Sequence, residues 1–373
     1  MNATSSGSLS ECFSEIADPR LKRKQRHNLQ DILMVSACAM LCGVETFVEI
    51  EEFGNAKEEW FKSFLELPNG IPSHDTFNRV FGLLEPKEFQ SAFTRWTAGL
   101  RQTLTEEIVA IDGKSLRRSR SKEHGPIHMV SAWAARNRLV LGQTKVEEKT
   151  NEITAIPELL STLQLKGCIV TIDAMDCQKD IPEEISKAGA DYCLALKGNH
   201  QTLHSEVESF MDDAQACGFK GVKHEHLQTE EKGHGREETR RYWITSDIDW
   251  LHGASEWKDL KSVGMVESTR KIGEKVTTER RFYLTSLPAD AKRFAQAVRE
   301  HWGIENRLHW VLDVSFNEDQ CRVREGYAAE NLATLRHLAL NLLRQNTQKK
   351  CGIKARQKCA GWDHKYLLSL LGF

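Results

Sequence analysis

The sequence predicts a mixed α/β protein with a helical N-terminal domain, a sheet covered by helices, and a β-rich insertion in that sheet domain. Apolar residues recur every three or four positions up to about residue 105, and short apolar runs then alternate with amphipathic helices up to about residue 200. Strand-like runs return before the last helical patterns. We expect two or three domains in 373 residues. The expected parts span 1–104, 105–200 with 289–345, 201–288, and a basic C-terminal segment at 346–373.

The N-terminal part contains three helical patterns. Leu29–Cys42 and Val44–Leu65 predict long apolar helices, and Ser73 caps a third with the stripe Phe77, Val80, Phe81 and Leu84. Because this third helix is short, capped and carries Arg79, it is a candidate for contact with DNA. Packing within a helical bundle explains the same pattern without DNA.

From Glu107 the pattern changes to short strands. Three strand-like runs predict an antiparallel meander, and two helix–strand units follow. These elements are strands Ile108–Ile111, Met129–Ala135 and Leu139–Val146, helix Ile153–Leu163, strand Cys168–Ile172, helix Asp180–Ala188 and strand Tyr192–Leu196. The order βββαβαβ is the ribonuclease H-like topology, in which the later strands are parallel because their crossovers lie on the faces of the sheet.

The insertion at 201–288 begins with an acidic helical segment and continues with strand-like runs at Arg241–Ile244, Ser262–Ser268 and Arg281–Leu284. A long helical pattern resumes at Ala289, and another follows at Ala328–Leu343. We expect these two helices to complete the interrupted ribonuclease H-like core.

Composition and the start of the chain predict a cytoplasmic protein. At 40% hydrophobic and 28% charged residues, the chain resembles ordinary soluble proteins. The longest apolar run, Ile32–Val44, is too short to cross a bilayer, and the polar start lacks the pattern of a signal peptide. The ten cysteines are scattered without a Cys-x-x-Cys pair, which favours reduced packing residues over disulfides or zinc ligands.

Positive charge is concentrated in three stretches of a chain whose net charge is −2. Residues 20–26, 114–122 and 344–365 carry a formal +16, which leaves −18 for the rest. Such an uneven distribution is typical of a surface that binds a polyanion. Each stretch taken alone is equally compatible with a solvated surface segment.

Two aspartates follow apolar strands and predict a metal site. Asp112 follows Ile108–Ile111, and Asp173 follows Cys168–Ile172. If these strands are neighbours, the carboxylates lie close together and repel each other unless a divalent cation binds between them. The alternative for Asp112 is a hairpin turn, because Asp-Gly is a common turn dipeptide. Asp176 and Asp180 are rivals for the second acid.

Glu305 is the candidate third acid, because it occupies an apolar stripe. The stripe consists of Phe294, Val298, Trp302, Glu305, Leu308 and Leu312. A glutamate on a buried face needs a partner, and metal coordination provides one. The alternative is an ion pair with Arg299 or Arg307. Other acids that compete for this place are Glu300, Asp313, Glu318 and Asp319.

Groups suited to bind a DNA backbone surround these acids. The candidates are Lys114, Arg117 and Arg118 after the first acid, Lys197 at the end of a strand, His301, Arg307 and His309 beside the third acid, and His234 and Arg236 in the insertion. For the last two, a solvated turn is an equal alternative. Trp302 and Trp310 suit base stacking, although a place in the core explains them as well.

Taken together, these motifs resemble those of the DDE transposases of bacterial insertion sequences, in the branch of the H-repeat-associated proteins. The resemblance covers nearly the whole chain. The matching motifs are Asp18-Pro19-Arg20, Pro72-Ser73-His74-Asp75-Thr76-Phe77, Ile111-Asp112-Gly113-Lys114, Ile172-Asp173-Ala174-Met175, Leu196-Lys197-Gly198-Asn199, His234-Gly235-Arg236 and Trp302-Gly303-Ile304-Glu305-Asn306-Arg307-Leu308-His309-Trp310. The Tyr-Arg-Glu-Lys signature of related transposases is absent, since Val298, His301 and Leu312 stand at its other places.

The resemblance implies that Asp112, Asp173 and Glu305 hold two Mg²⁺ or Mn²⁺ ions. It implies strand cleavage at the ends of an insertion sequence and transfer of the freed 3′-hydroxyl to target DNA by a two-metal mechanism. The expected partners are element-end and target DNA and, in the synaptic complex, a second copy of the chain. Two alternatives stay open: a metal-dependent nuclease or resolvase with the same fold, and a decayed transposase that binds DNA without cutting it.

Overall fold

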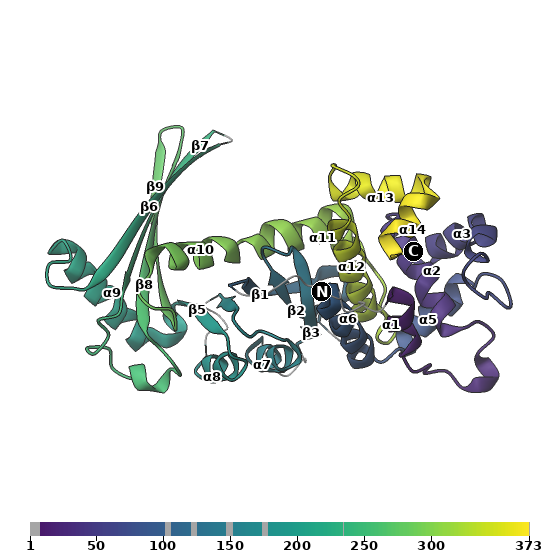
Figure 1. Cartoon of the computed structure of the whole chain (residues 1–373), viewed down its shortest axis with the longest axis horizontal. Helices are drawn as coiled ribbons and strands as arrows, with labels where there is room; N and C mark the ends of the chain where they lie inside the picture. Colours follow the sequence, from purple (N-terminus) through teal and green to yellow (C-terminus); the bar gives the residue numbers. More distant parts are fainter. Residues whose placement is uncertain are drawn as a thin grey trace, which may run out of the picture.

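The protein is elongated, with a helical end, a central mixed sheet, and a long β-blade at the opposite end (Figure 1). A computed structural model describes residues 8–100, 106–120, 125–146, 152–173, 178–233 and 235–372. One straight helical rod runs along the sheet from the blade towards the helical end (Figure 1). In the described part of the chain, no helix is both long and apolar enough to cross a membrane.

Within the described residues, nine strands form one sheet in the order β3-β2-β1-β4-β5-β9-β8-β7-β6. The strands are β1 (Ile108–Leu116), β2 (Ile127–Ala134), β3 (Leu139–Lys145), β4 (Ile169–Ile172), β5 (Asp191–Leu196), β6 (His224–Gly233), β7 (Arg236–Thr245), β8 (Ser262–Ile272) and β9 (Lys275–Thr285). The meander β1–β3 is antiparallel, and β4 and β5 are parallel to β1. The predicted ribonuclease H-like order is therefore confirmed.

Helices cover both faces of the sheet. On one face, α7 (Glu152–Thr162), α8 (Asp180–Lys187) and α9 (Gln201–Ala216) pack on apolar residues such as Val109, Ile111 and Val170. On the other face, α10 (Ala291–His301) packs across β1, β4, β5, β6 and β7. Residues 109 and 111 face the first layer, so the alternate residues Ala110 and Asp112 face the second, because strand side chains alternate.

The insertion extends the central sheet. It contributes α9 and the strands β6 to β9, and β9 joins β5 in antiparallel register, with Leu194 opposite Leu284. The distal parts of these strands form the blade in Figure 1. The sequence analysis predicted three of the four strands. It missed β6, because most of that strand's residues on both faces are exposed or half-buried and polar, so apolar residues do not alternate along it.

The N-terminal helices share one hydrophobic core with the end of the chain. The helices are α1 (Leu9–Ser14), α2 (Leu29–Leu41), α3 (Phe47–Ala56), α4 (Glu58–Phe61), α5 (His74–Leu83), α6 (Pro86–Leu100), α12 (Ala328–Gln345), α13 (Ile353–Trp362) and α14 (His364–Leu371). The core runs from α2 through α12 to α14. The single helix predicted for Val44–Leu65 is two helices, since Lys57 leaves helical geometry at φ −122°.

Candidate metal centre

The register of the central strands places Asp112 and Asp173 side by side. The parallel pairing of β1 with β4 ends at Ile111 opposite Ile172, and each aspartate is the next residue along its strand. Adjacent strands lie about 4.8 Å apart, so both side chains leave the same face at the same edge. β1 continues past Asp112, pairing Gly113 with Val130, which excludes the hairpin-turn alternative.

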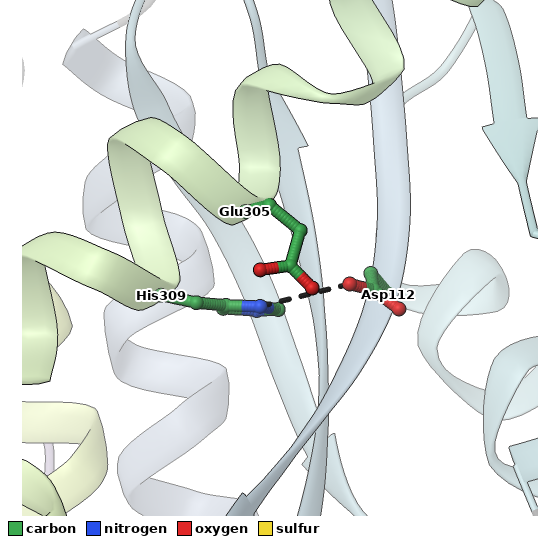
Figure 2. Close-up of side chains that lie close together, drawn as sticks. All are labelled: Asp112, Glu305 and His309. Atoms are coloured by element: carbon green, nitrogen blue, oxygen red, sulfur yellow. Dashed lines mark ion pairs between the residues drawn. The ribbon is translucent and has the colours of Figure 1, made fainter. Parts of the chain in front are cut away.

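Glu305 reaches the same place from the helical segment that follows α10. It begins a π-helical turn, η6 (Glu305–His309), between α10 and α11 (Trp310–Ser315). Figure 2 shows its carboxylate directed towards Asp112, with His309 beside it on the same turn. One oxygen of each acid and one ring nitrogen of His309 lie within 4.8 Å of one another. The distance from His309 Nδ1 to Asp112 Oδ2 is 3.6 Å.

The electrostatics of this group fit a divalent cation. The pKa of Asp112 is raised to about 7, chiefly by burial and also by the charges of Glu305, Glu152 and Asp173, against the lowering effect of a hydrogen bond from the Gly113 N–H. Burial lowers the pKa of His309 to about 4, so its imidazole is neutral at pH 7. Among the described residues, the buried His309 Nε2 has no hydrogen-bond partner. Crowded carboxylates and a neutral imidazole are suitable metal ligands.

Asp173 lies in a more open and more positive environment. Lys197 Nζ, at the end of β5, is 3.4 Å from both of its carboxylate oxygens. Behind it, His301 Nδ1 and Thr171 Oγ1 form a 2.9 Å hydrogen bond. Burial lowers the pKa of His301 to about 4, which makes it a neutral packing residue at pH 7. The charge of Asp173 thus helps to raise the pKa of Asp112, while the Asp173 carboxylate itself contacts Lys197.

The expectation that Glu305 lies on a buried face is wrong. Its side chain is exposed, and so are those of Trp302 and Trp310, although Phe294, Leu308 and Leu312 are buried. The uniform helix assumed for the stripe ends at Trp302, and a π-turn follows before α11. Such a turn holds an extra residue and rotates the side chains around it. The alternative partner Arg299 pairs instead with Glu231.

The rival acids of the third position have a different role. Asp313, Glu318 and Asp319 surround Lys114, whose Nζ lies 2.7, 3.2 and 3.1 Å from them. The Lys114 side chain is only 11% exposed. Its predicted contact with DNA therefore has no support in this arrangement, because the ammonium is an internal counter-ion that joins β1 to α11 and to the turn after it.

The other residues predicted to contact DNA include both exposed and buried side chains. Arg117, Arg118, Lys197 and Arg307 are exposed near the acids. Arg236 is exposed at the distal end of β7, opposite Ile272, at the far end of the blade. His234 lies outside the described residues, as does Asp176. His309 is buried and His301 half-buried, and burial lowers the pKa of both to about 4, so charge attraction to phosphate does not apply to them at pH 7.

The basic stretches are also less continuous on the surface than their sequence indicates. Arg20 is buried and paired with Asp18 at 2.7 Å. Arg344 lies over the Trp133 ring and donates to the Arg307 carbonyl, and burial lowers its pKa to about 9. These cations stabilise the interior of the protein.

Sequence reasoning missed a pair of side chains next to the candidate metal centre. Glu152, at the start of α7, accepts a hydrogen bond from His128 Nε2 on β2. Both side-chain ends occupy the space that a Cβ at Gly113 would need. Nothing in the sequence connects a strand histidine to a helix-start glutamate, so only the fold reveals that this pair lies against Gly113, next to Asp112.

Fold and site together place the chain among proteins with a ribonuclease H-like fold and an acidic centre on its parallel strands. The chain belongs to the Transposase DDE domain family, whose model matches residues 103–342. A second family model, described as DDE_Tnp_1-associated, matches residues 10–97.

Named relatives cover most of the chain. The H repeat-associated putative transposase YhhI of Escherichia coli (strain K12) is 40% identical over 370 residues, which is 97% of each chain. The putative transposase YncI of Escherichia coli O157:H7 is 42% identical over 371 residues, covering 98% of this chain and 94% of its own. A protein of Xanthobacter autotrophicus described as uncharacterized is 44% identical over 284 residues, which cover 74% of this chain and 94% of that protein.

Proposed function

We propose that this protein is a DNA transposase that cuts and joins strands at the ends of an insertion sequence with divalent metal ions. The observation that carries the proposal is the convergence of Asp112, Glu305 and His309 within 4.8 Å, with Asp173 next to Asp112 across the parallel strands. Residues almost 200 positions apart in the sequence meet there. Membership of the Transposase DDE domain family supports the reaction class.

In this proposal Asp112, Asp173 and Glu305 hold two Mg²⁺ or Mn²⁺ ions. When bound, these ions supply a nucleophile at neutral pH and stabilise the charge that develops on the phosphate. The protein contributes a rigid sheet edge for two of the acids and a π-turn that directs the third towards them. Lys197, beside Asp173, is placed to neutralise charge on a DNA phosphate.

His309 has a different proposed role from that expected. Because it is buried, neutral and within 4.8 Å of two acids, it is a candidate fourth ligand or a group that orients Asp112. A neutral imidazole brings no positive charge to a phosphate contact. We expect DNA at the element end and at the target to approach through the exposed Arg117, Arg118 and Arg307, and synapsis of two ends to require two copies of the chain.

Strand cleavage of end DNA taken from the inverted repeats beside the gene tests the proposal. With Mg²⁺ or Mn²⁺, Asp112→Asn and Asp173→Asn are each expected to reduce cleavage at least about 100-fold. Asp249→Asn, an exposed acid in the loop after β7, is the matched control and should retain wild-type cleavage. Unchanged cleavage by both site variants would remove these acids from the mechanism.

A strand-transfer assay separates the two catalytic alternatives. A transposase joins the cleaved 3′-end to a target plasmid, whereas a nuclease or resolvase releases cut ends that stay unjoined. Binding of end DNA without metal-dependent cleavage by the wild-type chain would identify a decayed transposase.

A further inference from the structure

Two basic segments that lie far apart in the sequence meet beside the metal centre. The first is the end of β1 and the 3₁₀ turn η2 (Arg117–Ser119), with Arg117, Arg118 and Arg120. The second follows the 3₁₀ turn η7 (Glu318–Gln320), with Arg322 and Arg324. Arg324 Nε donates to the Arg118 carbonyl at 3.2 Å, which joins the two segments directly. We call these five residues the arginine platform; all five are exposed.

Buried charges fix the platform in place. Lys114 and Arg117 both bind Asp319, at 3.1 Å each, and Arg336 lies 3.6 Å from Glu318. Since Lys114 already neutralises Asp319 from below, Arg117 stays 78% exposed above it. Lys114 and Arg336 therefore lie beside the acids beneath the platform. The side chains that the platform itself exposes are guanidinium groups. Such groups match phosphate oxygens in geometry and charge.

The position of the platform suits a DNA duplex rather than a single small anion. Arg117 follows Asp112 by five residues of nearly continuous strand, a span of about 16 Å. This corresponds to about five base pairs along a DNA axis. A phosphate at the metal centre would thus place the flanking backbone over the arginines.

A groove of about 520 Å³ beside the platform is lined by Arg322 and Arg324 and by the first turn of α5. It is also lined by Glu45, Asp75 and Glu325, whose negative charges repel phosphate. We therefore assign the DNA contact to the exposed arginines and not to this groove.

We propose that the arginine platform binds the phosphate backbone of the DNA duplex that flanks the scissile bond, independently of base sequence. This inference rests on the proposed function for the identity of the substrate. Lys114, which the sequence predicts to contact DNA, instead helps to hold Arg117 in place through Asp319. The platform also includes Arg322 and Arg324, which no sequence motif indicates.

The test is the salt dependence of duplex binding, measured by fluorescence anisotropy. Each lost phosphate contact reduces the slope of log affinity against log salt by about 0.9. Arg322→Gln combined with Arg324→Gln is expected to reduce the slope by about 1.8 and to weaken binding of end DNA and unrelated duplex equally. Lys62→Gln with Arg95→Gln, on the exposed helical end, is the matched control and should leave the slope unchanged.

Two further measurements keep the outcomes distinct. Thermal unfolding of the double variant should match the wild type, and Arg322→Gln alone should reduce the slope by about 0.9 without disturbing the Arg324–Arg118 contact. At saturating DNA, the cleavage rate should stay within about twofold of wild type, because these residues bind without touching the reacting atoms. An unchanged slope in a folded double variant overturns the platform even if wild-type cleavage is intact. A reduced slope supports it even if the wild-type chain fails to cleave.

Discussion

Burial and, to a smaller extent, neighbouring carboxylates raise the pKa of Asp112 to about 7, so the folded protein keeps this proton up to about pH 7. The ordinary pKa of this group is 3.8. Between these values the folded state binds more protons than the unfolded state, so the free energy of unfolding decreases as pH rises through this window. The ionised carboxylate costs the metal-free protein on the order of 4 kcal/mol above pH 7. A bound cation removes this cost.

We predict that Asp112→Asn stabilises the metal-free protein at alkaline pH. With a chelator present, its melting temperature should exceed that of the wild type at pH 8, and the difference should disappear below pH 4. Adding Mg²⁺ should raise the melting temperature of the wild type and much less that of the variant. Thermal unfolding across this pH range checks both effects. Parallel pH profiles of the two proteins would show that Asp112 does not carry this proton.

Individual residues of the site differed in how well the sequence predicted them. Asp112 and Asp173 could be placed because a buried strand that ends in an acid is a local signal. The apolar stripe that selects Glu305 assumes a uniform helix, whereas the π-turn leaves this side chain exposed beside Asp112. His309 was interpreted as a phosphate contact, since sequence does not show burial. The Glu152–His128 pair depends on tertiary packing alone. The metal-binding and DNA-binding roles of these residues stay predictions.

At the scale of elements, Lys114 joins β1 to α11 and η7 by three ion pairs. We predict that Lys114→Met lowers the free energy of unfolding by about 3–5 kcal/mol, because it removes the cation that these three carboxylates share. Lys114→Arg should restore most of this loss. Urea unfolding measures the effect. A loss below about 1 kcal/mol for the methionine variant would mean that the three acids find other partners.

The packing of α10 against β8 depends on one glycine. A Cβ at Gly264 of β8 would lie 2.5 Å from the Phe294 ring of α10, which is fully buried and has no room to move. Gly264→Ala is predicted to cost about 1–3 kcal/mol by overpacking. Because α10 leads into the turn that carries Glu305, we also expect weaker Mn²⁺ binding by titration. Gly233→Ala, on β6 with open space around it, is the control that should change neither quantity.

At the scale of the whole molecule, the layered sheet and its helices could be predicted because apolar periodicity is local. The assembly of the helical end could not. The sequence analysis separated residues 1–104 from a basic C-terminal segment, yet α2, α12 and α14 bury their side chains in one core. Long-range packing of this kind leaves no periodic signal, and the many lysines of the last segment concealed the apolar faces of α13 and α14.

This shared core predicts the outcome of removing residues 346–373. Four large side chains of α14 are buried in the core that it shares with the N-terminal helices: Tyr366, Leu367, Leu370 and Leu371. At about 1.5–3 kcal/mol each, their loss removes roughly 6–12 kcal/mol as an upper estimate, comparable to the whole stability of a typical domain. We therefore expect the truncated chain to lose cooperative unfolding in circular dichroism and to bind a hydrophobic dye. Lys350→Gln with Lys358→Gln removes charge from the same segment at exposed positions and should preserve the wild-type transition, which separates packing from charge. A truncated chain that melts like the full protein would show that the N-terminal helices form a complete core without α14.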